Sequence, residues 1–129
     1  EILENSKSVH TVSRLKEVEK IDLLYKNHEI FVQINIDNDP KKSGINLNDV
    51  QKFFEKFENY SFFPNGIMCI PDINSDPRES FKNMNDINQK LLDNYKQYNG
   101  ELSMGMSSDH KIALDYGATI IRVGSKIFK

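Results

Sequence analysis

The residues best suited to chemistry lie in two segments near the end of the chain. Residues 102–109 read LSMGMSSD, and residues 117–125 read GATIIRVGS. In each segment a glycine and a serine stand where a predicted strand gives way to the next element. Glycine lets the backbone approach a ligand closely, while hydroxyls and the free N–H groups at the start of a helix bind anions. The two segments together predict a site for a phosphate group.

A plain structural reading of the same segments stays open. A glycine and a serine after a strand are also the usual composition of a turn followed by a helix cap. Ligand binding is favoured because two such sites follow successive strands and Arg122 stands on the second. In parallel α/β folds, ligands gather at the carboxyl ends of the strands.

Other candidate residues indicate no further chemistry. The three histidines are far apart and lack the spacing of metal ligands, so we predict neither a metal site nor a catalytic residue. The single cysteine, Cys69, is flanked by apolar residues and is predicted to be a small buried hydrophobe rather than a nucleophile. Asp37, Asp39, Lys41 and Lys42 are interpreted as a solvated loop.

Composition sets the class of protein. The 129 residues suffice for one compact domain, and 17 basic against 19 acidic residues give a net charge of −2. No basic cluster dominates, so we predict no nucleic-acid partner and no membrane partner. The absence of a long apolar run and of a signal peptide favours a cytoplasmic protein.

Apolar periodicity predicts strands that alternate with helices. The strands are expected at residues 9–12, 30–36, 67–70, 101–104 and 118–123. The helices are expected after Ser13, after Asn46 or Asn48, at 77–98, and from Ser107 as N-cap to Tyr116, with Gly117 at the C′ position. Such a chain forms either an open doubly wound sheet or an arc of a barrel, since a complete eight-unit barrel needs ~250 residues.

These segments and several others resemble the pyridoxal phosphate homeostasis protein family. The resemblance runs in order along nearly the whole chain and is most specific at residues 102–109 and 117–128. Its other matching pieces are His10-Thr11-Val12-Ser13, Gln33-Ile34-Asn35-Ile36, Lys42-Ser43-Gly44, residues 66–71 (GIMCIP), and Arg78 with Phe81.

The resemblance implies an α/β fold, a partial (β/α)8 TIM-type barrel like the barrel domain of alanine racemase (fold type III). Residues 1–129 would be its C-terminal part, about five β/α units of a single barrel domain that binds pyridoxal 5′-phosphate (PLP). Ser107 and the backbone of Gly124 and Ser125 match the family's phosphate-binding positions. Arg122 matches the arginine that faces the pyridine nitrogen, and Ser103 is a further expected contact.

Arg122 carries a mechanistic expectation. A guanidinium always donates and is not deprotonated in a protein, so beside the ring nitrogen it disfavours a pyridinium and makes the ring a poor electron sink. This agrees with the function that the resemblance implies, a non-catalytic PLP carrier and regulator in intracellular PLP homeostasis. The alternatives are a fragment of a fold type III racemase or decarboxylase, or a remnant that no longer binds PLP.

The departures from the family concern its first half. The lysine that forms the Schiff base has no counterpart here, because neither Lys42 nor Lys126 stands in the matching strand context. We therefore expect impaired PLP binding. We also expect two open sheet edges and a need for a partner, either the missing N-terminal half or another copy of the chain.

Overall fold

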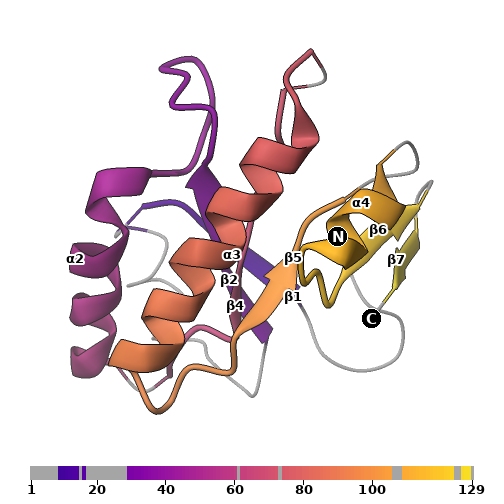
Figure 1. The fold of residues 1–129 in the computed structure, drawn as a ribbon. Helices are drawn as coiled ribbons and strands as arrows, with labels where there is room; N and C mark the ends of the chain where they lie inside the picture. The colour runs from indigo at the N-terminus through magenta and orange to yellow at the C-terminus, as the bar shows by residue number, and fades with distance from the viewer. Residues whose placement is uncertain are drawn as a thin grey trace.

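A parallel β-sheet with helices packed on one face forms the centre of the structure (Figure 1). The computed structural model describes residues 9–14, 16, 29–60, 62–72, 74–105, 109–123 and 126–128. Most of the predicted helix after Ser13 lies outside these residues, although Lys16 is described and helical. The elements are, in chain order, β1 (Val9–Val12), β2 (Glu29–Asn35), β3 (Ile45–Asn46), η1 (Leu47–Asp49), α2 (Val50–Glu55), η2 (Lys56–Asn59), β4 (Gly66–Met68), α3 (Pro77–Asn94), β5 (Glu101–Ser103), α4 (His110–Asp115), β6 (Ile121–Val123) and β7 (Lys126–Phe128).

The strands of the sheet stand side by side in the order in which the chain makes them. The order is β1-β2-β4-β5 with every pair parallel, and β3 pairs with the end of β2. A parallel bridge from Ser103 to Ile120 continues the series beyond β5. The α/β class with a parallel sheet is thus confirmed. Along the path β1-β2-β4-β5, each described strand lies beside the one that precedes it in the path, without a change of direction across the sheet.

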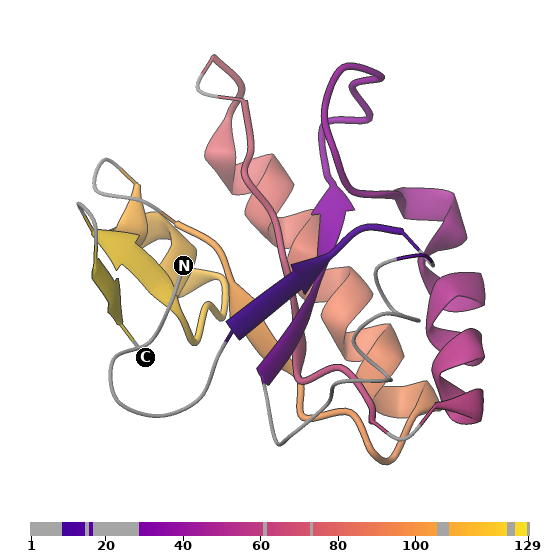
Figure 2. The same cartoon turned by 180° about the vertical axis from the view of Figure 1, so that it is seen from behind.

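Both faces of the sheet are buried, as expected for parallel strands. On one face, Ile30, Val32 and Ile67 join the main core beneath α2 and α3, whereas Phe31, Met68 and Ile120 form a separate cluster. Figure 2, seen from behind, shows that neither α2 nor α3 crosses this second face. The sheet therefore has a helix-covered face and a face that these two helices leave uncovered.

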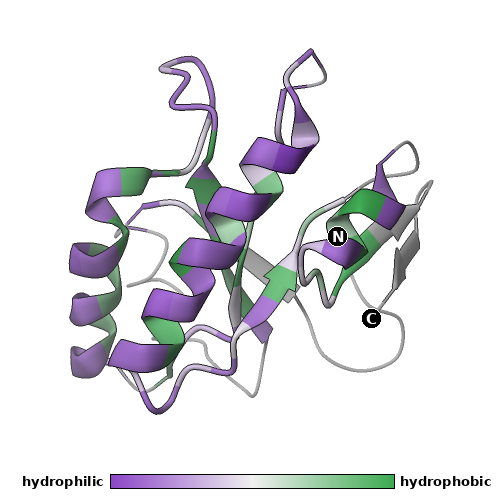
Figure 3. Cartoon of the chain, in the orientation of Figure 1, coloured by the Kyte–Doolittle hydropathy of each residue, from purple (hydrophilic) through white to green (hydrophobic). Residues whose placement is uncertain are grey.

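The helices are placed by amphipathic stripes predicted from the sequence. The stripe of α2 and η2 is buried as expected at Val50, Phe53, Phe54 and Phe57. Figure 3 shows hydrophilic residues on the outward turns of α2 and α3 and hydrophobic residues on the strands behind them. The ring of Phe54 is central to this layer, because it packs edge-on against Tyr98 with the ring centroids 5.5 Å apart.

Local capping explains where the helices begin and end. Asp76 accepts a hydrogen bond from the backbone N–H of Arg78, and Pro77 opens α3, as is common at the first helical position. After α4, the N–H of Gly117 donates to Leu114 and the N–H of Ala118 donates to Ala113. With Gly117 at a φ of +100°, this is a Schellman motif, and the prediction of Gly117 at C′ is confirmed.

The predicted elements differ from the structure at several ends, most clearly in α3, in α4 and after β6. Helix α3 ends at Asn94 rather than Tyr98, because Tyr95 is extended and donates its hydroxyl to the backbone oxygen of Gln51 at 3.3 Å. Helix α4 begins at His110 with Asp109 at the N-cap position, later than expected from Ser107. Finally, β7 follows β6 as an antiparallel neighbour, where no strand was predicted.

Candidate functional site at the carboxyl edge of the sheet

The carboxyl ends of the parallel strands meet along one edge, where ligands gather in this class of fold. The register brings one residue of each strand into a row near that edge. Gln33 of β2 pairs with Met68 of β4, Met68 pairs with Ser103 of β5, and Ser103 pairs with Ile120 just before β6. The row along this edge thus runs from Gln33 through Met68 and Ser103 to Ile120. Arg122 follows Ile120 by two positions, within β6.

Backbone hydrogen bonds join the two strand ends that carry the predicted site. The N–H of Met104 donates to the oxygen of Ile120 at 3.1 Å, and the N–H of Ile120 donates to the oxygen of Leu102 at 3.2 Å. Thr119 adds a side-chain bond, since its Oγ1 accepts from the N–H of Leu102 at 2.8 Å. The exits of β5 and β6 are thus held side by side.

Gly105 brings α4 directly onto the exit of β5. Its φ is +105°, and a Cβ built on it would lie 2.6 Å from the Cβ of Ala113 in α4. An L-residue at this position would be strained by its backbone and would collide with the helix. Gly105 was predicted to permit the close approach of a ligand, and in the structure it permits the close approach of α4.

The described residues bring together only part of the predicted site. Ser103 lies at the end of β5, is 9% exposed, and its backbone oxygen accepts from the N–H of Cys69 at 3.2 Å. Arg122 lies within β6, although its side chain is outside the described part. Ser107, Gly124 and Ser125 also lie outside the described residues. Their roles stay predictions.

One expectation attached to Ser125 was wrong. We expected the residues after Ser125 to begin a helix with free N–H groups, but they form β7, which pairs Val123 with Lys126 and Arg122 with Ile127. The short run of Lys126, Ile127 and Phe128 contains a β-branched and an aromatic residue, which favour a strand when a neighbour is available. The described residues after Ser125, 126–128, therefore supply no helix N-terminus to an anion site.

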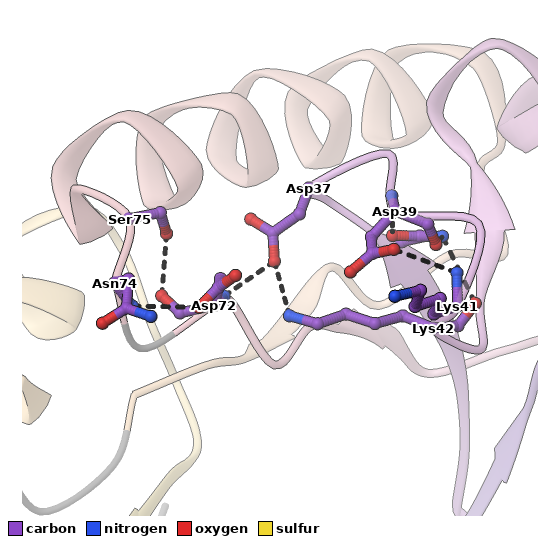
Figure 4. Close-up of polar contacts among 8 residues, drawn as sticks. Asp37, Asp39, Lys41, Lys42, Asp72, Asn74 and Ser75 are labelled. Atoms are coloured by element: carbon purple, nitrogen blue, oxygen red, sulfur yellow. Dashed lines mark hydrogen bonds and ion pairs between the residues drawn. The ribbon is translucent and has the colours of Figure 1, made fainter.

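A polar network that the sequence analysis missed joins two loops at the same edge (Figure 4). Oδ2 of Asp37, in the loop after β2, accepts from Nζ of Lys42 and from the backbone N–H of Asp72, both at 2.7 Å. Asp72 belongs to the loop between β4 and α3, so one carboxylate holds both loops. The interpretation of Asp37 and Lys42 as merely solvated was wrong.

Asn35 organises the first of these loops from the end of β2. Its Oδ1 accepts from the N–H of Asp39 at 3.1 Å, and its Nδ2 donates to the oxygen of Asp39 at 2.8 Å. Asn side chains often stabilise turns by hydrogen-bonding to the backbone of the residues that follow. The signal that could have located the network was therefore an Asn at the end of a buried strand, followed by Asp and Lys.

The network changes the ionisation of Lys42. The hydrogen bond to Asp37 raises the pKa of the Lys42 ammonium, and the charges of Asp37, Asp72 and Asp39 raise it further against a smaller desolvation effect. Lys42 also lines a pocket of about 270 Å³ with Gln33 and Ile70. At neutral pH this pocket is thus edged by a charged ammonium rather than by a nucleophilic amine.

The prediction that Cys69 is buried is confirmed. It is 4% exposed, and burial raises the pKa of the Cys69 thiol to about 12, with a smaller contribution from nearby carboxylates. The described ranges contain no group of three or more His, Cys, Asp or Glu side chains placed to hold a metal ion. Within those ranges no helix is both long and apolar enough to span a membrane.

The fold and this edge define an α/β protein of the kind that carries ligands at its strand ends, and comparison with known proteins narrows the class. No protein-family model matches the chain. A pyridoxal phosphate homeostasis protein of Vibrio cholerae is 34% identical over 93% of this chain and 54% of its own length. The chain spans about half the length of the curated relatives it matches, between 44% and 56% for the first three.

Solved structures agree with the sequence comparison. PipY of Synechococcus elongatus without PLP superposes with a TM-score of 0.80 at 27% identity, covering 90% of this chain and 58% of that one. The PLP-bound form of PipY gives 0.78 at 26% identity, covering 90% and 57%. A lysine/ornithine decarboxylase of Vibrio vulnificus shares the fold, with a TM-score of 0.63 at 17% identity over 76% of this chain and 27% of that one. The resemblance to the pyridoxal phosphate homeostasis protein family is confirmed.

Proposed function

We propose that the chain binds PLP at the edge formed by the exits of β5 and β6 and acts in intracellular PLP homeostasis as a non-catalytic carrier and regulator. The observation that carries this proposal is the register of the two strands. Ser103 stands beside Ile120, and Arg122 follows two positions later on the same strand. Alternate positions of a strand share a face, so positions 120 and 122 fall on the same side of the sheet as position 103.

The residues present suit the cofactor's phosphate and ring. Ser107, Gly124 and Ser125 would hold the phosphate through hydroxyls and backbone N–H groups, with Ser103 next to them. When bound, PLP supplies an aldehyde that reacts with amines and a ring that can accept electrons. Arg122 would donate to the ring nitrogen and keep it unprotonated, which weakens the ring as an electron acceptor. Holding the cofactor is the role that this residue set favours.

We further propose that the chain is the C-terminal part of one PLP-binding (β/α) barrel domain, with about five units spanning residues 1–129. Sequential parallel order, helices on one face, and likeness to PipY over 90% of the chain support an arc of a barrel rather than a doubly wound sheet. The remaining strands and a Schiff-base lysine would come from an N-terminal half or another copy of the chain. A cytoplasmic location also stays a prediction.

A second reading is a fragment of a fold type III decarboxylase or racemase. The Vibrio vulnificus decarboxylase supports the fold of this reading alone, because its identity is only 17%. A racemase also needs a second base at the ring, and we identify none among the residues assigned to the site. The third reading, a remnant without PLP binding, rests on the unmatched lysine.

Titration with PLP, followed by borohydride reduction and peptide mapping, distinguishes these readings. We expect saturable binding that Arg122→Ala weakens by about tenfold, because a charge-assisted hydrogen bond is lost. Lys42→Ala is the matched control and should change the affinity by less than about twofold, since Lys42 is held by Asp37.

The outcomes separate clearly. A borohydride-trapped lysine adduct would support covalent binding, and a weak, non-covalent complex would support a site that holds the phosphate alone. Equal affinities of the two variants would contradict the assignment of Arg122, and a wild-type chain that does not bind PLP would favour the remnant.

A further inference from the structure

A second pocket lies at the opposite end of the sheet from β5 and β6. It measures about 580 Å³ and is lined by three cationic side chains, those of Arg14, Lys52 and Lys56. Arg14 follows β1, the first strand of the order β1-β2-β4-β5, so β2 and β4 separate this pocket from the proposed cofactor site. Arg14 is distant in sequence from Lys52 and Lys56, and the fold brings it to the same pocket as the two lysines.

Among the described residues that line the pocket, the cations are joined by one acidic side chain, that of Asp49. The described lining residues therefore carry a positive formal charge, although the whole chain carries −2. The buried ring of Phe53 and the side chain of Ile45 provide apolar lining. The volume lies in the range of ligand pockets, roughly 300–1,000 Å³.

Two basic side chains of α2 and η2 line the pocket together with Asp49. Asp49, Lys52 and Lys56 are three or four residues apart, which places them along one side of the helical segment facing the pocket. Glu55 stands three residues after Lys52 and so borders this side, and the charges of Glu55 and Glu58 help to raise the pKa of Tyr95, an effect whose largest cause is burial. Neither Glu55 nor Glu58 lines the pocket.

The two lysines are also available to a ligand. Both are exposed, and neither forms an ion pair within 4.0 Å among the described residues. Lysine ammonium groups act as compact point charges toward phosphate, and an arginine adds a planar fork that matches phosphate oxygens. Cations from two separate segments around one hollow suit a ligand with several negative charges.

We propose that this pocket binds a small molecule that carries two or more phosphate groups. One phosphate would contact Arg14, and the next would lie between Lys52 and Lys56. Asp49 lies among these cations and weakens the binding of an anion by repulsion, and the ring of Phe53 offers an apolar surface to the rest of the ligand. This site is independent of the proposed cofactor site.

The test is calorimetric titration of the whole chain with tripolyphosphate, at about 50 mM salt so that exposed charges are little screened. We expect one tripolyphosphate per chain. The double variant Lys52→Ala/Lys56→Ala should bind about tenfold more weakly, because two charge-assisted contacts are lost. Asp49→Asn should bind more tightly, because a repulsive charge is removed.

Two controls make the result specific. Lys90→Ala/Lys96→Ala removes the same charge from exposed positions elsewhere and should leave the affinity within about twofold. Arg122→Ala should have no effect, which separates this pocket from the proposed PLP site. An equal loss in both lysine pairs, more than one tripolyphosphate per chain, or weaker binding by Asp49→Asn would overturn the proposal.

Discussion

Cys69 and Lys42 carry the side chains at the carboxyl edge that are nucleophilic when deprotonated, and both are held protonated. Burial raises the pKa of the Cys69 thiol to about 12, whereas a hydrogen bond to Asp37 raises the pKa of the Lys42 ammonium. The causes differ, because burial favours a neutral thiol and the carboxylate favours a charged amine. At the scale of the residue, neither Cys69 nor Lys42 is a ready nucleophile at neutral pH.

The state of Cys69 predicts slow labelling and a defined alkaline transition. At pH 8 a thiol reagent should react far more slowly with the folded chain than with the urea-unfolded chain, because a pKa rise of this size leaves about 1,000-fold less thiolate. Cys69 is the single cysteine, so the labelling signal has one source. Equal rates in the folded and unfolded chain would contradict the burial of the thiol.

The same shift sets the direction of the pH dependence. Below pH 9 the thiol is neutral in both states, and above it the unfolded chain ionises first, so the Cys69 contribution to stability is lost as the pH rises from about 9 to about 12. Cys69→Ala should show a shallower fall of the unfolding free energy in this window, measured by urea denaturation. If the unfolding free energy of Cys69→Ala falls with pH as steeply as that of the wild type, the raised pKa of Cys69 is contradicted.

At the scale of the element, the spacing of β4 and β5 depends on Gly66. A Cβ at this position would lie 2.0 Å from the backbone oxygen of Glu101 and 2.8 Å from Cε2 of Phe31. No rotamer change can relieve a collision with backbone, so the two strands would have to separate. The close spacing of β4 and β5 therefore requires a glycine at position 66.

We expect Gly66→Ala to lower the unfolding free energy by about 3 kcal/mol, the upper part of the usual range for overpacking. Gly117→Ala is the comparison. Its Cβ would lie no closer than 3.4 Å to Asn85, so its cost should be only that of the left-handed backbone, about 1–2 kcal/mol. Urea midpoints measure both variants, and an equal or larger cost at Gly117 would refute the strand-spacing argument.

The elements that the sequence could predict are those determined locally. The stripe of Phe53, Phe54 and Phe57 has helical spacing, and Gly117 is a recognisable stop, so both were found in place. Strand β7 was missed because three residues become a strand only beside β6. The end of α3 was missed because Tyr95 continues the apolar spacing while its hydroxyl bonds to the backbone of α2.

The candidate site shows the same division. Glycines and hydroxyls after two strands predicted an edge, and the register of Ser103 with Ile120 places those two strands together. The Asp37 network joins residues 35 positions apart, and the cationic pocket joins Arg14 to Lys52 and Lys56. Neither can be read from spacing, because each depends on which strands become neighbours.

At the scale of the whole molecule, we expected two open sheet edges, and the structure changes this expectation at the β6 end. The antiparallel β7 takes the place beside β6 that another parallel strand would have, while β1 has β2 as its one neighbour among the described strands. The cluster of Phe31, Met68 and Ile120 is buried on the face that α2 and α3 leave uncovered. Ile70, 49% exposed, lies just beyond β4 at the carboxyl edge.

We therefore expect the chain alone to self-associate, as measured by sedimentation velocity with thermal melting. Ile70→Asp should reduce association, because it places a charge at an apolar contact. Leu114→Asp is the matched control, since Leu114 is 50% exposed but lies on α4. A monomeric, cooperatively melting wild-type chain would contradict the need for a partner.

Asp37 also has a consequence for how the two loops at this edge move. Because one oxygen accepts from Lys42 and from the backbone of Asp72, the two loops share a single anchor. The loop after β2 cannot move away from the loop after β4 without breaking the bond between Asp37 and the N–H of Asp72, so we expect the two loops to move together.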